Sequence, residues 1–106
     1  MARAQFVVFT YAHPGRESDL AQWYTDQHIP DLLRIPGIEA ARRFDLEAVK
    51  LPPGIAIPTS LTVYDFDGDI PAIQAELAAR QGTPEMVWTD ALDSSRTIAL
   101  LAHPKN

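Results

Sequence analysis

One stretch of the chain, WYTDQHIPDLLRIPG at residues 23–37, combines aromatic residues, a histidine and a proline at helical spacing. Trp23, Tyr24 and His28 fall on the apolar side of the predicted helix, where His28 takes a position that usually holds leucine or isoleucine. Pro30 has no N–H to donate to the preceding turn, so we expect the helix to kink or restart and to open space beside His28. Imidazole has an unperturbed pKa near neutrality, and His28 is therefore a candidate general acid or base.

A structural role for His28 fits the same pattern. In this alternative His28 is a core histidine that hydrogen-bonds a backbone carbonyl released by Pro30. The two interpretations predict different surroundings for the imidazole. A catalytic histidine would line a largely apolar cavity walled by Trp23, Tyr24 and the segment 83–93, whereas a core histidine would be packed closely on all sides.

Arg42 is a candidate for binding a substrate carboxylate, because a guanidinium can form two parallel hydrogen bonds to that group. Residues 38–46 alternate as a half-buried strand does, and this alternation places Arg42 on the face of Ile38 and Phe44. The alternative is a solvated arginine at the sheet edge whose aliphatic stem covers apolar surface. A shift of register by one residue would exchange the positions of Arg42 and Arg43.

Three further side chains could complete a ligand site. Tyr64, in the predicted strand 60–66, could orient a polar ligand group, or it could be a core residue with a satisfied hydroxyl. The segment 83–93 is longer than a simple connection requires, and long loops often serve as lids or binding loops. Trp88 and Asp90 are its candidates for an aromatic wall and an acidic group. In the alternative, this segment plugs the open end of the sheet with its apolar side chains.

Turn-forming Pro, Gly and Asp residues divide the chain into six elements. Runs of β-branched and aromatic residues predict strands, whereas apolar residues three or four apart predict helices. The predicted elements are strands at 4–11, 38–46, 60–66 and 96–102, and helices at 16–35 and about 70–81. The simplest packing of the order β-α-β-β-α-β is a ferredoxin-like α+β fold, with one four-stranded antiparallel sheet and both helices on a single face. A chain of 106 residues has room for one such domain, spanning residues 1–106.

The first and last strands carry apolar side chains on both faces. Phe6 and Val8 alternate with Val7 and Phe9, and the strand 96–102 shows the same pattern. Strands of this kind are usually covered on both sides, and a small domain gains buried surface by oligomerisation. We therefore expect a homodimer formed through the sheet faces. The alternative is that these side chains simply lie at the surface.

Composition argues against several classes of function. With a formal net charge of −5 and scattered Lys and Arg residues, the chain lacks the basic surface typical of nucleic-acid binding. It has no cysteine, zinc-like ligand spacing, phosphate loop or dinucleotide fingerprint. No apolar run approaches the ~20 residues that span a bilayer, and no signal-peptide cleavage site stands out. We therefore expect a cytoplasmic protein with no metal, no cofactor, and neither nucleic-acid nor membrane partners.

The combination of Trp23-Tyr24, His28-Ile29-Pro30, Leu32 and Pro36-Gly37 resembles the EthD-type branch of the dimeric α/β-barrel superfamily. The motif covers residues 6–44, and the rest of the chain matches by element order. The resemblance implies a pocket between helices and sheet in each subunit, lined by the histidine at position 28. The family includes muconolactone-type isomerases, cofactor-free monooxygenases, and polyketide cyclases and dehydratases. Some members carry a proton-handling tyrosine soon after the Pro-Gly turn, and here residues 38–44 have no hydroxyl.

The histidine and this resemblance together predict a cofactor-independent enzyme that acts on a small, largely apolar, aromatic or cyclic metabolite. The reaction would be a proton transfer of the isomerase, cyclase or dehydratase type, with His28 as acid or base. The predicted substrate contacts are Trp23, Tyr24, Arg42, Tyr64, Trp88 and Asp90. Oxygen insertion by a cofactor-free monooxygenase is the second enzymatic possibility. The alternative outside enzymatic function is a non-catalytic dimer that binds a small hydrophobic ligand.

Overall fold

The computed structural model describes residues 2–105 and has the predicted order of elements. The strands are β1 (Ala2–Thr10), β2 (Ile38–Phe44), β3 (Ser60–Gly68) and β4 (Ile98–Ala102), and the helices are α1 (Glu17–Trp23), α2 (Ile29–Leu33) and α3 (Ile70–Arg80). A π-helical turn, Tyr24–His28, joins α1 to α2 into one helical segment, and a 3-10 turn, Ser94–Arg96, precedes β4. None of the helices within residues 2–105 has the length and apolar character that a bilayer crossing requires.

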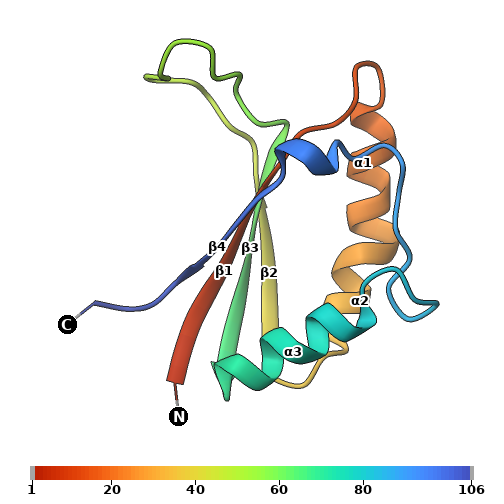
Figure 1. The fold of residues 1–106 in the computed structure, drawn as a ribbon, viewed down its shortest axis with the longest axis vertical. Helices are drawn as coiled ribbons and strands as arrows, with labels where there is room; N and C mark the ends of the chain where they lie inside the picture. The colour runs from red at the N-terminus through yellow and green to blue at the C-terminus, as the bar shows by residue number, and fades with distance from the viewer. Residues whose placement is uncertain (1, 106) are drawn as a thin grey trace.

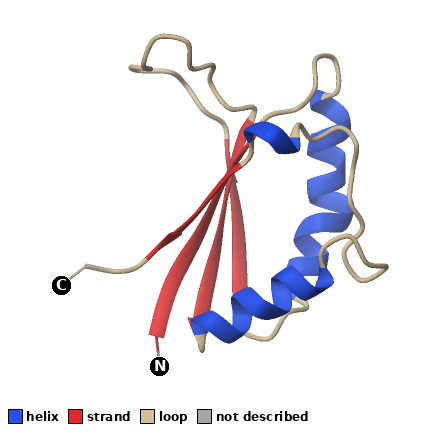
Figure 2. Ribbon diagram, viewed as in Figure 1, coloured by secondary structure: helices blue, strands red, loops and turns tan. Residues whose placement is uncertain are grey.

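The four strands form one antiparallel sheet in the order β2-β3-β1-β4. Both helical segments cover the same face of this sheet, and the other face carries no helix (Figures 1 and 2). The predicted ferredoxin-like α+β fold is therefore confirmed. It follows from local signals, because alternating strands and apolar helix stripes can bury their faces together only when the helices lie on the sheet.

The hydrophobic core lies between the helices and the covered face of the sheet. One buried cluster, under α2 and α3, includes Leu32, Ile35, Phe66, Ile73, Leu77 and Met86. A second cluster, under α1, contains Ala12, Leu20, Trp23, Tyr24, Ala91 and Leu92. Each large apolar side chain buried in this way contributes about 1.5–3 kcal/mol to folding. The first cluster fixes α2 and α3 against the sheet, and the second fixes α1 against Ala12 and the segment 83–93.

A β-bulge near the start of β2 decides which side chains face the helices. Ile38 lies opposite Phe66, but Ala40 lies opposite the next residue of β3, Asp65, so β2 contains one extra residue. An extra residue reverses the direction of every side chain that follows. Arg42 consequently lies on the face without helices, opposite to Ile38, and the predicted grouping of these two residues is wrong.

The face without helices presents a continuous apolar surface in the described chain. The strand registers place Phe9 beside Leu61 and Ile98, and Leu61 beside Phe44. The side chains of Phe44 and Ile98 are 42% and 45% exposed. The connection 45–59 extends away from the helices on this side (Figure 1). An apolar patch of this kind is typical of an interaction surface, so the homodimer through the sheet faces stays our prediction.

We expect the protein to sediment as a dimer at micromolar concentration, and a Leu100→Asp variant to sediment as a monomer. Leu100 is 54% exposed on the face without helices, and a carboxylate there would be desolvated in the dimer. The control is Leu33→Asp, because Leu33 is exposed to a similar degree, 42%, on a helix. A wild-type chain that sediments as a monomer would contradict the prediction.

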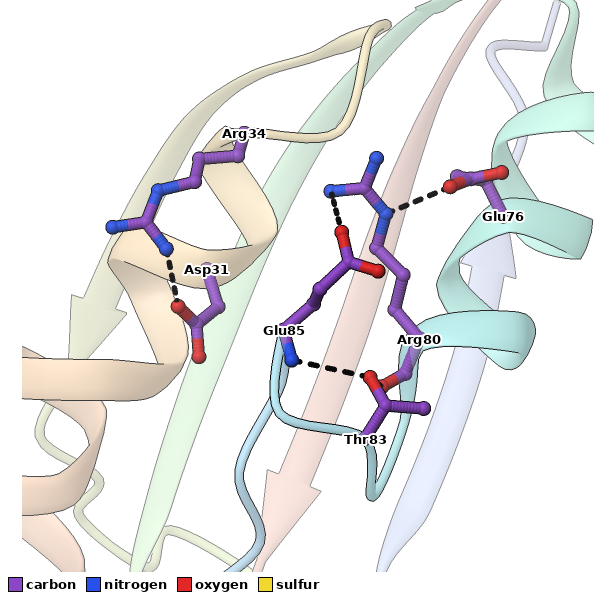
Figure 3. Close-up of polar contacts among 6 residues, drawn as sticks. All are labelled: Asp31, Arg34, Glu76, Arg80, Thr83 and Glu85. Carbon is purple, nitrogen blue, oxygen red and sulfur yellow. Dashed lines mark hydrogen bonds and ion pairs between the residues drawn. The ribbon is translucent and has the colours of Figure 1, made fainter.

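The segment 83–93 leaves α3 through a set of polar contacts around Arg80 (Figure 3). The Nε of Arg80 donates to Glu76 at 2.7 Å, and its Nη1 lies 3.9 Å from a carboxylate oxygen of Glu85. The hydroxyl of Thr83 donates to the carbonyl of Arg80 at 2.6 Å and accepts from the backbone N–H of Glu85 at 3.2 Å. These contacts give the segment a defined start, from which it passes over α1.

Candidate functional site

His28 is the last residue of the π-helical turn. The N–H of Ile29 donates to the carbonyl of Tyr24, five residues earlier, as a π-helix requires. Pro30 has no N–H for the carbonyl of Asp26, which removes one bond of a regular α-helix at this point. The helix therefore widens beside His28 and continues into α2. Single π-helical turns of this kind are frequent at functional sites.

The imidazole of His28 is enclosed by two aromatic rings. It stacks on Trp23 with ring centroids 4.2 Å apart and lies edge-on to Tyr24 at 5.5 Å. His28 is 8% exposed, and its Nδ1 is buried with no hydrogen-bond partner. Burial lowers the pKa of His28 from 6.5 to about 4, because desolvation disfavours the charged form. At pH 7 the imidazole is therefore neutral and can accept a proton.

These surroundings match the core interpretation of His28 in packing but not in hydrogen bonding. The close aromatic packing is what a core histidine predicts, but the hydrogen bond from Nδ1 to a released carbonyl is absent. A buried nitrogen without a partner costs free energy of about 1–3 kcal/mol. Unpaired groups of this kind in a native structure require an explanation, and a ligand that supplies the missing partner is one.

A set of buried hydroxyl groups lies on the sheet beneath Tyr24. The Tyr24 hydroxyl donates to Thr10 at 3.4 Å, and Thr10 shares a 2.9 Å hydrogen bond with Ser60. The hydroxyls of Thr62 and Tyr64 are buried with no hydrogen-bond partner. Burial raises the pKa of Tyr64, and the neighbouring Tyr24 raises it further. Tyr64 is therefore a neutral hydroxyl that can donate one hydrogen bond.

Arg43 brings a positive charge to this set of groups. The bulge in β2 turns its side chain toward the helices, opposite Thr62. Its guanidinium carbon lies 4.5 Å from the centre of the Tyr24 ring, which is the geometry of a cation–π contact. The Nε of Arg43 is buried with no hydrogen-bond partner. Arg42, the residue predicted for this role, instead forms an ion pair with Asp65 at 2.9 Å on the other face.

We call these groups the polar cluster: His28 Nδ1, Arg43 Nε and the hydroxyls of Tyr24, Thr62 and Tyr64. Of the predicted site residues, the structure brings together His28, Trp23, Tyr24 and Tyr64. The prediction chose Arg42 and gave Arg43 only as the result of a one-residue shift of register, because nothing in the sequence marks a bulge. It did not include Thr10 or Thr62, although Thr62 lies two residues from Tyr64 in the same strand and therefore faces the same side.

The segment 83–93 covers Trp23 from outside. The indole Nε1 of Trp23 donates to the carbonyl of Val87 at 3.0 Å, and Trp88 lies edge-on to Trp23 at 5.9 Å. Trp88 is 45% exposed, so it stands at the outer side of the aromatic pair. Asp90 is exposed and forms an ion pair with Arg16 at 3.0 Å, away from His28. The segment contributes an aromatic wall, but Asp90 is not brought to the imidazole.

The ends of this segment are fixed while its middle is exposed. Met86 is fully buried in the core, and Leu92 pairs with Ala12 in an isolated β-bridge. Val87 and Trp88 between them are about half exposed. Part of the segment therefore does plug the end of the sheet. The part over Trp23 is more exposed than these two anchors, which is typical of segments that open.

Two clefts in the described part of the chain lie along α1, and the first of them borders the polar cluster at Arg43. A cleft of about 380 Å³ between α1 and the start of β3 is lined by Arg43, Leu20 and Ser60, among others. A second, of about 330 Å³, lies along Trp23 and Trp88. A larger cleft, of about 590 Å³, lies by Arg42 on the face without helices, far from the cluster. None of these three clefts is lined by His28, so the cavity expected around a catalytic His28 is not among them, and Arg43 is the group of the polar cluster that borders the first cleft.

The lowered pKa of His28 predicts a loss of stability as the pH falls. The unfolded chain takes up a proton at this residue below pH 6.5, whereas the folded chain does so only near pH 4. The stability that the folded chain gains by keeping His28 neutral is therefore fully present above pH 7. It is lost as the pH falls from 6.5 to 4. Between pH 7 and pH 5 we expect wild type to lose about 2 kcal/mol more unfolding free energy than His28→Gln.

Urea unfolding at the two pH values measures this difference. His13→Gln is the matched control, because His13 is exposed in the connection after β1 and should leave the pH dependence of wild type unchanged. Equal losses in wild type and His28→Gln would show that the imidazole is not held neutral by burial.

Comparison with known proteins finds a likeness in fold. No protein-family model matches the sequence, and no significant match is found among curated proteins. Among solved structures, the chain is similar to the crystal structure of an ethyl tert-butyl ether D (EthD) family protein from Bacillus halodurans. The TM-score is 0.60 and the sequence identity 15%, and the match covers 97% of this chain and 99% of that chain. The predicted resemblance is thus confirmed at the level of the fold, which this chain shares with that EthD family structure over nearly its whole length.

Proposed function

We propose that this protein is a cofactor-independent enzyme that moves a proton on a small, largely apolar, aromatic or cyclic substrate. His28 would act as the general base. The observation that carries the proposal is the buried imidazole, neutral at pH 7, whose Nδ1 has no partner in the chain. A neutral imidazole can accept a proton from carbon when the electrons left behind move onto a conjugated carbonyl oxygen.

The proton balance defines the reaction class. Imidazole removes a proton from a carbon next to a carbonyl, and an enolate and an imidazolium form. The imidazolium then returns the proton to another carbon, which is an isomerisation, or to a departing hydroxide, which is a dehydration. A pKa of about 4 makes His28 a weak base in the free chain. A negative oxygen formed beside the ring raises that pKa, because an opposite charge favours the imidazolium.

The rest of the polar cluster supports binding of a polar group on such a substrate. Tyr64 and Thr62 carry buried hydroxyls without partners, and each can donate a hydrogen bond to a carbonyl oxygen. Trp23 and Tyr24 supply aromatic surfaces for an apolar ring. Donors placed in a dry site before the substrate arrives stabilise developing charge more effectively than water does.

A second candidate is a dimer that binds a hydrophobic ligand without changing it. The observation that favours it is the packing of His28, which touches two aromatic rings and lines none of the three clefts described above. No hydroxyl or carboxylate in the described chain hydrogen-bonds Nδ1 and could relay a proton from it.

A metabolite screen that records both binding and turnover separates the two candidates. Cyclic and aromatic carbonyl compounds are incubated with wild type and with His28→Ala, and products are followed by mass spectrometry. The enzyme proposal expects turnover by wild type that the variant lacks. Equal turnover by both proteins makes His28 structural. Ligands that bind both proteins with no product from either favour the binding dimer.

A further inference from the structure

Arg43 carries a positive charge into the covered side of the sheet without a carboxylate partner. Its Nε is buried and unpaired, and within residues 2–105 no ion pair joins it to an Asp or Glu side chain. By contrast, Arg34, Arg42 and Arg80 each contact a carboxylate at 2.7–2.9 Å. A partly buried guanidinium without an anion is costly. The missing anion is therefore the feature of Arg43 that needs an explanation.

The contacts of Arg43 leave its edge available while one face is occupied. The Tyr24 ring lies against the guanidinium, with 4.5 Å between the guanidinium carbon and the ring centre. Such stacking uses the flat face of the group, whereas hydrogen bonds leave from its edge. The same tyrosine touches His28, at 5.5 Å between ring centres. Arg43 and the imidazole thus both contact the ring of Tyr24.

A cleft gives access to Arg43 from solvent. Its volume is about 380 Å³, which lies within the range of small-molecule sites. Glu17 and Asp45 line the same cleft and are exposed, but within residues 2–105 neither forms an ion pair with Arg43. With no ion pair to a carboxylate within residues 2–105, the guanidinium is left for an anion that a ligand supplies.

We infer that Arg43 is the specificity-determining residue of this site and that it selects ligands bearing an anionic oxygen, a carboxylate or an enolate. The inference rests on the proposed site and names the class of molecule that enters it. The edge of the guanidinium donates charge-assisted hydrogen bonds to the anionic oxygen, which are about twice as strong as neutral ones. Arg43 binds the oxygen and His28 faces the carbon skeleton of the same molecule.

The test uses benzoate, phenylacetate and cyclohexanecarboxylate as probes, each paired with its uncharged amide. Binding is measured by titration, and the Arg43 Nε–H resonance is followed in ¹⁵N-correlated NMR spectra. We expect the acids to move this resonance, and at least one acid to bind wild type tenfold or more tightly than its amide. Arg43→Gln should abolish that preference, and Arg43→Lys should restore part of it. Arg42→Gln is the matched control, because Arg42 lies on the opposite face and should not alter binding.

Two results would overturn the inference: no shift of the Arg43 resonance with any acid at tens of millimolar, or an unchanged preference in Arg43→Gln. The outcome is independent of turnover. Selective acid binding without any product would remove the proposed catalysis and leave the role of Arg43 intact. Turnover that depends on His28 but not on Arg43 would remove the role of Arg43 and leave the proposed catalysis intact.

Discussion

Replacing His28 by Gln is expected to lower turnover of a substrate found by screening by roughly 10²- to 10⁴-fold, the usual contribution of a positioned general base. Glutamine is close to histidine in size and keeps polar atoms at this position, but it cannot take up a proton at neutral pH. The loss should appear in kcat, because the base acts in the transition state and contributes little to holding the substrate.

Two controls separate this effect from a loss of structure. His103→Gln changes an exposed histidine beyond the end of β4 and should keep full turnover. Circular dichroism and thermal unfolding of His28→Gln at pH 7 should show a folded protein, because the substituted imidazole was neutral there. A folded His28→Gln protein with wild-type kcat would eliminate His28 as the base.

Replacing Gly37 by Ala is expected to lower the free energy of unfolding by about 3 kcal/mol, combining left-handed strain with overpacking. Gly37 lies in the turn between α2 and β2 and has a φ of +99°. A Cβ added there would lie 2.7 Å from Cγ1 of Ile73 and 3.2 Å from the carbonyl oxygen of Asp67. Ile73 is 4% exposed in the core under α3 and has little room to move.

Gly54→Ala is the matched control for this change. Gly54 also has a positive φ, +82°, but a Cβ added there meets nothing within 4 Å. The Gly54→Ala variant should therefore lose only the free energy of left-handed backbone strain, about 1 kcal/mol. Urea unfolding of the two variants measures the difference. Equal losses of unfolding free energy in the two variants would show that Ile73 moves aside to accept the added methyl group. The close approach of α3 to this turn would then add nothing to stability.

Much of the scaffold of this protein could be predicted from local patterns. Strand alternation, helix spacing and turn residues predicted the order β-α-β-β-α-β and the side of the sheet that the helices cover. His28 was expected on the buried stripe of its helix, and it lies there at 8% exposure. These features depend on residues a few positions apart, and their physical causes, side-chain period and missing N–H groups, can be read along the chain.

The composition of the polar cluster was decided by tertiary structure. One extra residue between Ile38 and Ala40 exchanged the faces of Arg42 and Arg43, and nothing local in the sequence specifies that bulge. The lack of a partner for His28 Nδ1 likewise depends on how Tyr24 packs against β1 and Trp23 against the segment 83–93. Local sequence determined which groups could do chemistry, but long-range register and packing decided which of them meet, because a one-residue shift in a strand moves a charge from one face of the sheet to the other.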